Sequence, residues 1–236
     1  MTSLEATTIF THSWSLYDLI TEHNYMFHRE IYEEINNLLI SHNKSGQYNL
    51  LDLGCGNARY LAPCLKQSPP ARYSGVDLSE AALAQARKYL SSVPASISLT
   101  HEDMLAAVES TKEKWDVVFT GFALHHLAIE DKSRFFYAVN RCLSENGWLI
   151  LVDVIREENQ SRENYIKNYL EFMRQKWTEV PPDRLEEACK HVHDHDYPEP
   201  LSSLREMTKK AGLNTCRVIN HYDRHYILLF YRSAHS

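Results

Sequence analysis

Several features that assign a chain to a particular class of protein are missing from this sequence. No apolar stretch approaches the roughly 20 residues that span a bilayer, and no basic segment followed by an apolar run opens the chain. Its 25 lysine and arginine residues, against 31 acidic ones, form no cluster that would bind a nucleic-acid backbone. We therefore expect a soluble cytoplasmic protein, with no membrane and no nucleic acid among its partners.

Pairs of cysteines are missing as well. The five cysteines lie far apart, with no Cys-x-x-Cys pair that would indicate zinc binding or redox chemistry, and we expect reduced thiols. The sequence contains no internal repeat and no low-complexity tract. Its 236 residues are enough for one domain to bury a full core without disulfides.

The most informative segment that is present is 49–58, Asn-Leu-Leu-Asp-Leu-Gly-Cys-Gly-Asn-Ala, in which an apolar strand leads into a glycine turn. Such a turn lets a ligand lie close against the backbone. Asp52, two residues before the first glycine, would repel a pyrophosphate and attract an ammonium or sulfonium group, and S-adenosylmethionine carries both. Arg59 stands where a dinucleotide-binding motif has glycine or alanine. The segment therefore favours a cationic ligand over a dinucleotide.

The order of the expected elements indicates an α/β fold. Apolar residues recur at helical spacing from 14 to 42, and near-continuous apolar strands then alternate with helices up to residue 153. Such alternation predicts a parallel sheet covered on both faces. The expected strands are 48–53, 73–77, 95–100, 115–120 and 147–153, with helices at 58–66, 79–90 and 132–143. Near the end, a helix at 201–211 precedes strands at 215–221 and 225–231, whose three-residue connection suits an antiparallel hairpin.

On these residues the chain resembles the class I S-adenosylmethionine-dependent methyltransferases, whose first motif is an acidic residue, any residue, and then Gly-x-Gly-x-Gly. Ala58 replaces the third glycine, which keeps a small side chain and excludes a need for positive φ there. The resemblance implies a Rossmann-like, seven-stranded, mostly parallel sheet with a C-terminal antiparallel hairpin. We expect a single domain with an N-terminal helical lid at 1–45, a core at 46–155 and 200–236, and a helical cap insert at 156–199.

Two further carboxylates complete the expected cofactor site. Asp77 ends the second strand, a little over twenty residues after Gly54, where it would bind ribose hydroxyls or else cap the helix that starts near Ser79. The resemblance implies that Asp103 accepts from the adenine amino group, with capping of the next helix as the alternative. The expected cofactor-binding residues are Tyr17, Asp52, Gly54, Cys55, Gly56, Asp77, Leu78, Asp103, Met104, Thr120, Gly121 and Phe122.

Four side chains are candidates for a catalytic base. His125 and His126 follow the fourth strand, where histidine, which titrates near neutrality, could take a proton or instead bond to backbone. His28 and Asp153 are the other two candidates. A hydroxyl, thiol or protonated amine acceptor would need such a base, whereas a carboxylate or a neutral amine would not.

Aromatic and polar side chains before the first strand and in the insert are candidates for enclosing the acceptor. The expected substrate residues are Tyr25, Arg29, Arg156, Tyr169, Trp177 and His195. The histidine-rich run 191–197 contains good metal ligands, but alternating residues share one side only in an extended segment. We therefore favour helix capping or a substrate-facing loop for this run and expect no metal.

These patterns together predict transfer of a methyl group from S-adenosylmethionine to an oxygen, nitrogen or sulfur atom of a small molecule by in-line displacement. One alternative is a protein that holds S-adenosylmethionine or S-adenosylhomocysteine without turnover. Another is a methyltransferase acting on RNA or protein. The residues around Asp52 make a nucleotide-dependent oxidoreductase the weakest alternative.

Overall fold

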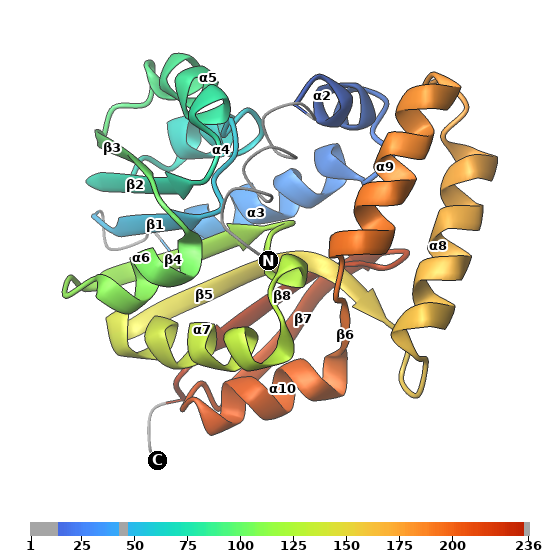
Figure 1. Cartoon of the computed structure of the whole chain (residues 1–236). Helices are drawn as coiled ribbons and strands as arrows, with labels where there is room; N and C mark the ends of the chain where they lie inside the picture. Colours follow the sequence, from blue (N-terminus) through green and yellow to red (C-terminus); the bar gives the residue numbers. More distant parts are fainter. Residues whose placement is uncertain (1–13, 43–46, 234–236) are drawn as a thin grey trace.

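The computed structural model describes residues 14–42 and 47–233, which form an α/β fold around one sheet (Figure 1). The strands are β1 Asn49–Leu53, β2 Arg72–Asp77, β3 Ser96–His101, β4 Trp115–Gly121, β5 Leu143–Arg156, β6 Glu199–Pro200, β7 Thr215–Tyr222 and β8 His225–Tyr231. They lie in the order β3-β2-β1-β4-β5-β8-β7, and the short β6 pairs with the end of β5 off this path. β1 to β5 run parallel, while β8 is antiparallel to both β5 and β7. This confirms the expected fold class.

Helices cover both faces of the sheet (Figure 1). One face carries α3 His28–His42, α4 Leu61–Gln67 and α5 Glu80–Leu90, and the other carries α6 Met104–Ser110, α7 Ile129–Cys142 and α10 Leu201–Lys210. Successive strand residues alternate between the two cores because side chains of a strand point to opposite faces. Leu50 packs with the first set of helices and Leu51 with the second.

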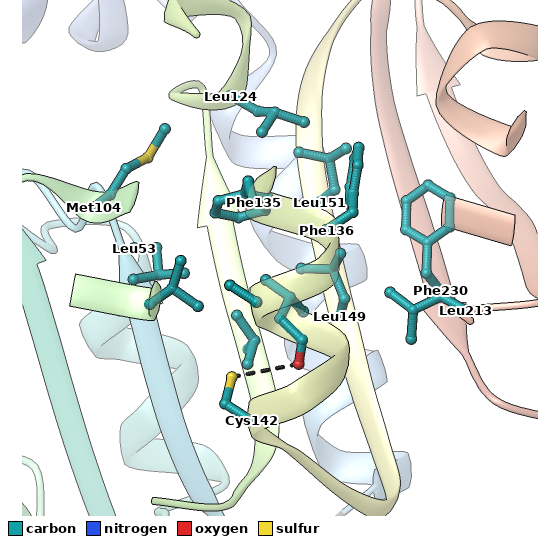
Figure 2. Close-up of a cluster of buried hydrophobic side chains, with 14 of the residues drawn as sticks. Leu53, Met104, Leu124, Phe135, Phe136, Cys142, Leu149, Leu151, Leu213 and Phe230 are labelled. Atoms are coloured by element: carbon teal, nitrogen blue, oxygen red, sulfur yellow. Dashed lines mark hydrogen bonds between the residues drawn. The ribbon is translucent and has the colours of Figure 1, made fainter. Parts of the chain in front are cut away.

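The core on the α7 side packs this helix against β5 and β8. Figure 2 shows Phe135 and Phe136 of α7 among the side chains of Leu149 and Leu151 of β5 and Phe230 of β8. All five side chains are fully buried, and each contributes about 1.5–3 kcal/mol of hydrophobic stabilisation. All five cysteines are free, and no helix in the described ranges has the length and apolarity needed to cross a membrane.

A separate group of helices lies beyond the carboxyl end of β5. It contains α2 Trp14–Glu22, α8 Arg162–Lys176 and α9 Pro182–His195, and Figure 1 shows α8 and α9 side by side. A separate apolar cluster joins Leu16 and Ile20 of α2 to Tyr169, Met173 and Cys189 of the two cap helices. The N-terminal and inserted helices are thus held together by their own core.

Several elements differ from those expected. The helix expected at 58–66 begins only at Leu61, because the glycine turn extends as far as residue 60. β5 continues to Arg156 where β6 pairs with it, and α6 is a full helix that the sequence indicated only through its cap residue. The helix after β2 is capped by Ser79, as expected, through a bond to the Ala82 N–H.

The glycine turn contains a correction at Ala58. Gly54, Gly56 and Ala58 have φ angles of 76°, 52° and 54°, so the expectation that Ala58 needs no positive φ is wrong. A left-handed conformation costs an alanine about 1–2 kcal/mol. The Ala58 methyl is buried in the core on the α3 side, which returns about 0.8 kcal/mol. Burial of the methyl group therefore offsets part of the strain.

Gly54 is the position in this turn that a methyl group should damage. A Cβ there would lie 2.7 Å from the Cβ of Ala123, in addition to the positive φ. We expect Gly54→Ala to lower the free energy of unfolding by about 2–4 kcal/mol, measured by urea denaturation. The matched control, Ala58→Gly, should change it by less than about 1 kcal/mol. Equal effects of the two substitutions would contradict the close approach at Gly54.

Candidate active site

The turn after β1 is tied to the end of β2. The backbone N–H groups of Gly54 and Cys55 both donate to the Val76 carbonyl, at 2.9 and 3.0 Å. Asp77 accepts from the Gly56 N–H through one carboxylate oxygen and from the Ser79 N–H through the other, each at 2.8 Å. Burial raises the pKa of Asp77, and these backbone bonds act in the opposite direction. The second carboxylate thus lies directly beside the glycine turn.

Asp52 lies beneath this turn with only 2% of its surface exposed. Its Oδ2 accepts from the Tyr73 hydroxyl at 2.7 Å, and its Oδ1 has no partner among the described residues. Burial raises the pKa of Asp52 to about 7, although the Tyr73 bond works against that shift. A buried carboxylate oxygen without a partner is costly, and a cationic group would satisfy it. The site therefore fits the cationic ligand expected from the sequence.

Asp103 shows the alternative role that the sequence left open. Its Oδ1 caps α6 by accepting from the N–H groups of Leu105 and Ala106, at 3.0 and 2.9 Å. Met104 is buried, and its sulfur lies 3.8 Å from the point that a Cβ on Gly54 would occupy. The Leu78 carbonyl oxygen lies 2.8 Å from Nε2 of the His101 ring. Met104 therefore borders the glycine turn.

Phe122 is a strained aromatic residue at the carboxyl end of β4. Its φ is 56°, which is costly for a bulky side chain, and its N–H donates to the Val152 carbonyl at 2.8 Å. Its ring stacks on His28, with centroids 4.7 Å apart, and also contacts His225 at 5.9 Å. Just before it, Thr120 is buried, and its hydroxyl has no partner among the described residues. A Cβ on Gly121 would lie 3.1 Å from the Phe119 ring, which is a tight contact.

The two histidines that contact Phe122 are buried and neutral. Burial lowers the pKa of His28 to about 3 and that of His225 to about 4. His225 Nδ1 lies 3.3 Å from the Tyr222 carbonyl, which can only accept, so Nδ1 carries the proton and Nε2 has a lone pair. The Tyr17 hydroxyl lies 2.9 Å from His28 Nε2, and burial raises the tyrosine pKa. We assign Tyr17 as the donor, which leaves an N–H on His28 Nδ1.

This pair presents one buried donor and one buried acceptor. His28 Nδ1 and His225 Nε2 both have no partner in the described part of the chain. His28 was among the sequence candidates, but His225 was not, because it belongs to no motif and only opens the last strand of the hairpin. Contact between the hairpin and Phe122 exists only in the folded chain.

His125 and Asp153 form a buried ion pair. Asp153 accepts from the His125 backbone N–H at 2.9 Å and from its Nδ1 in a very short bond. Burial acts to lower the pKa of His125, but the carboxylates of Asp153 and Asp196 outweigh it and raise the pKa to about 9. A histidine that is cationic at neutral pH has no lone pair with which to take a proton. The geometry therefore favours positioning over base catalysis for this pair.

His126 and Asp196 lie beside this pair. Burial and the charge of His125 lower the pKa of His126 well below its ordinary value. Burial raises the pKa of Asp196 to about 6, with His125 acting against that shift. Asp196 is the C-cap residue of α9, so this group connects the cap to the end of β4. The sequence placed Asp196 in a polar run and gave no sign that it would meet His125.

The expected substrate residues occupy three different places. Tyr25 stacks on Trp177 with ring centroids 5.5 Å apart, and Trp177 also contacts Tyr169 in the core of the cap. Arg29 is exposed and donates to the Glu22 carbonyl, whereas Arg156 donates to the Pro198 carbonyl at 3.0 Å. The His195 ring faces His191 at 5.3 Å. The aromatic members hold the cap to the lid, and the two arginines bind backbone.

Part of the chain matches a family model, and the chain as a whole is similar to several solved structures. Residues 51–149 match the model of a family described as a methyltransferase domain. A carboxy-S-adenosyl-L-methionine synthase from Campylobacter hominis is 22% identical over 205 residues, 87% of this chain and 86% of that protein.

Solved methyltransferases share the fold. A magnesium protoporphyrin IX methyltransferase from Synechocystis with bound S-adenosylhomocysteine has a TM-score of 0.60 at 18% identity, over 87% of this chain and 84% of that one. A structure described as a DhpI complex with the same ligand has a TM-score of 0.62 at 13% identity, over 97% and 96%. An O-methyltransferase family protein from Burkholderia thailandensis has a TM-score of 0.61 at 15% identity, over 96% and 64%.

The buried neutral state of His28 should appear in the pH dependence of stability. Below pH 6.5 the unfolded chain binds a proton at His28 that the native protein, with a pKa of about 3, does not, so stability falls as the pH drops through this window. We expect His28→Gln to reduce the slope of unfolding free energy against pH by about 1.4 kcal/mol per pH unit between pH 5.5 and 4. Urea denaturation at several pH values measures this slope.

The control for this experiment is His221→Gln, which alters an exposed histidine of β7. It should leave the slope between pH 5.5 and 4 unchanged, which ties the change in slope to the buried histidine. A wild-type slope in His28→Gln would mean that His28 accepts a proton in the native protein.

Proposed function

We propose that this chain, which has the fold of the class I S-adenosylmethionine-dependent methyltransferases, binds S-adenosylmethionine and transfers its methyl group to a small molecule. The observation that carries the cofactor proposal is a buried oxygen of Asp52 that has no partner among the described residues, next to a glycine turn and the Asp77 carboxylate. Asp52 attracts the cationic part of the cofactor. Asp77 accepts from the ribose hydroxyls. Met104 and Leu78 flank the adenine.

Bound S-adenosylmethionine would supply a methyl carbon already activated by its sulfonium, so the protein contributes alignment and exclusion of water. Phe122, His28 and His225 provide both at the end of β4. Their rings form a wall without charge at neutral pH, and the strained backbone of Phe122 directs its ring to this position. Because uncharged rings of this kind exclude water, they strengthen each hydrogen bond made to the acceptor.

The two histidines also favour a class of acceptor. His225 Nε2 accepts a hydrogen bond, and His28 Nδ1 donates one, so together they suit a hydroxyl or amino group, which can do both. His225 takes the position of proton acceptor at the reacting group, and His28 orients that group. His125, His126 and Asp153 act indirectly, by holding the end of β4.

The cap supports a small acceptor. Tyr25 bonds through its hydroxyl to the Glu179 N–H at 2.9 Å and stacks on Trp177, so lid and cap are joined above the strand ends. A site covered by a joined lid and cap admits a small molecule more readily than a folded RNA or protein. The net charge of −6 also opposes binding of RNA.

A second candidate comes from the curated relative, which is named as a carboxy-S-adenosyl-L-methionine synthase. That name implies a change to the cofactor itself, with no separate methyl acceptor. Mass spectrometry after incubation with methyl-labelled cofactor and a metabolite extract separates the two candidates. Labelled product together with S-adenosylhomocysteine supports methyl transfer, whereas a carboxylated cofactor supports the synthase. The absence of both products would favour a binding protein without turnover.

We expect Asp77→Ala to weaken binding of S-adenosylhomocysteine by about 1–3 kcal/mol, or roughly 5- to 150-fold, because a charged hydrogen bond to the ribose is lost. Isothermal titration calorimetry measures this change, and Asp77→Asn should give a smaller loss. The matched control is Asp116→Asn, since Asp116 also accepts from a backbone N–H, that of Asn49 at 2.9 Å. Asp116 lies near the amino-terminal end of β4, away from the strand ends that form the proposed site. Unchanged affinity in both folded Asp77 variants would remove Asp77 from the site.

We expect His225→Phe to lower methyl transfer at least about tenfold while leaving the dissociation constant of S-adenosylhomocysteine within about twofold, because only the acceptor loses a partner. His225→Gln, which keeps a polar acceptor, should retain part of the activity. The control is His221→Phe on the exposed part of the same hairpin. Full transfer by a folded His225→Phe protein would exclude His225 from the acceptor site.

A further inference from the structure

We propose that His125, His126 and Asp196 form a binding site for one divalent transition-metal ion, with Zn²⁺ as the model ion. One donor atom from each of these side chains lies within 4.8 Å of the others. Asp196 Oδ1 is 3.7 Å from His125 Nε2 and 3.5 Å from His126 Nδ1. Neither distance is that of a good hydrogen bond. A tetrahedral ion with bonds of about 2.0–2.1 Å separates its ligands by about 3.4 Å, so the spacing already suits an ion.

The buried oxygen of Asp196 gives independent support. Asp196 is 4% exposed, and its Oδ1 has no hydrogen-bond partner among the described residues. This oxygen points toward the two imidazoles, since the short distances to both rings start from it. Leaving a carboxylate oxygen buried without a bond is costly, and a metal ion would satisfy it.

The surroundings of His125 resemble the outer shell of a metal site. Asp153 accepts from His125 Nδ1, which turns Nε2 toward Asp196. Histidine ligands of metals commonly donate their other ring N–H to a carboxylate, which fixes the ring and makes the ligating nitrogen more basic. The ion would replace the proton that His125 holds between the two carboxylates.

His126 can form a hydrogen bond when no ion is bound and can ligate the ion when one is present. Its Nδ1 lies 3.3 Å from the His195 carbonyl and donates to it when no ion is bound. Ligation moves the ring proton to Nε2, which requires a change of tautomer and little movement of the ring. The His191 ring lies against His126, with centroids 5.3 Å apart, and it or water would take the fourth position.

The ligand set and its location indicate the type of ion and its effect. Two imidazoles and one carboxylate suit Zn²⁺, Co²⁺ or Fe²⁺ better than Mg²⁺ or Ca²⁺. His125 and His126 lie in η2, the 3-10 helix Leu124–His126 after β4, whereas Asp196 ends α9. An ion would therefore fasten the cap to the end of β4, close to Phe122. Its binding does not depend on methyl transfer.

The test is binding of Zn²⁺ alone to the full chain after removal of metals with a chelator. We expect one equivalent by calorimetry, retained through dialysis and counted by elemental mass spectrometry, and a visible absorption band typical of four-coordinate geometry when Co²⁺ is used. Asp196→Asn and His126→Gln should each weaken Zn²⁺ at least about 100-fold. Asp153→Asn should weaken it about 10- to 100-fold, as expected for an outer-shell partner.

The matched controls are His193→Gln and Asp194→Asn, which alter exposed and half-buried neighbours on α9. Both should bind Zn²⁺ as the wild type does, and circular dichroism checks that every variant is folded. Less than about 0.1 equivalent of Zn²⁺ on the wild-type protein would overturn the proposal. Wild-type affinity in folded Asp196→Asn, or loss of binding in the His193 or Asp194 controls, would overturn it as well.

Discussion

The interaction on which the rest of the site depends is the buried contact between His125 and Asp153. It fixes the residues after β4 against β5 through two bonds, and the His125 carbonyl accepts from the Tyr197 N–H at 2.7 Å, which adds the end of the cap. Removing one partner of a buried ion pair costs about 3–5 kcal/mol, because a buried charge is left unpaired. His125 therefore joins the residues after β4 to the end of β5 and to the end of the cap.

Two different environments meet at the carboxyl ends of the strands, one with a charged histidine and one with neutral histidines. On the α7 side, carboxylates keep His125 charged, whereas on the α3 side burial keeps His28 and His225 neutral. Phe122, three residues before His125, stacks on His28 and contacts His225. Charged groups hold the scaffold in place, and neutral groups border the proposed acceptor. A neutral wall preserves low polarity where water has to be excluded, while the charges remain where they are paired.

Much of the fold could be predicted because local patterns carry it. Alternating apolar strands and helices, and the short connection expected between the last two strands, were enough for the parallel sheet and its hairpin. Less of the site could be predicted. The motif marked Asp52 and Asp77 by their distance from glycine, but Ala58 adopts a positive φ that its residue type disfavours, and burial of its methyl group offsets part of the strain. His225 carries no local signal at all.

The sequence by itself determined the order of strands and helices, the glycine turn and the carboxylates beside it, since these depend on residues close together in the chain. Only the tertiary structure decided the partners of the histidines. Asp196 lies 70 residues after His126 and His225 almost 200 after His28, so their contacts arise from sheet order and cap packing. The charge state of each imidazole follows from those contacts, because burial and neighbouring carboxylates set the pKa of a histidine more strongly than its position in the sequence.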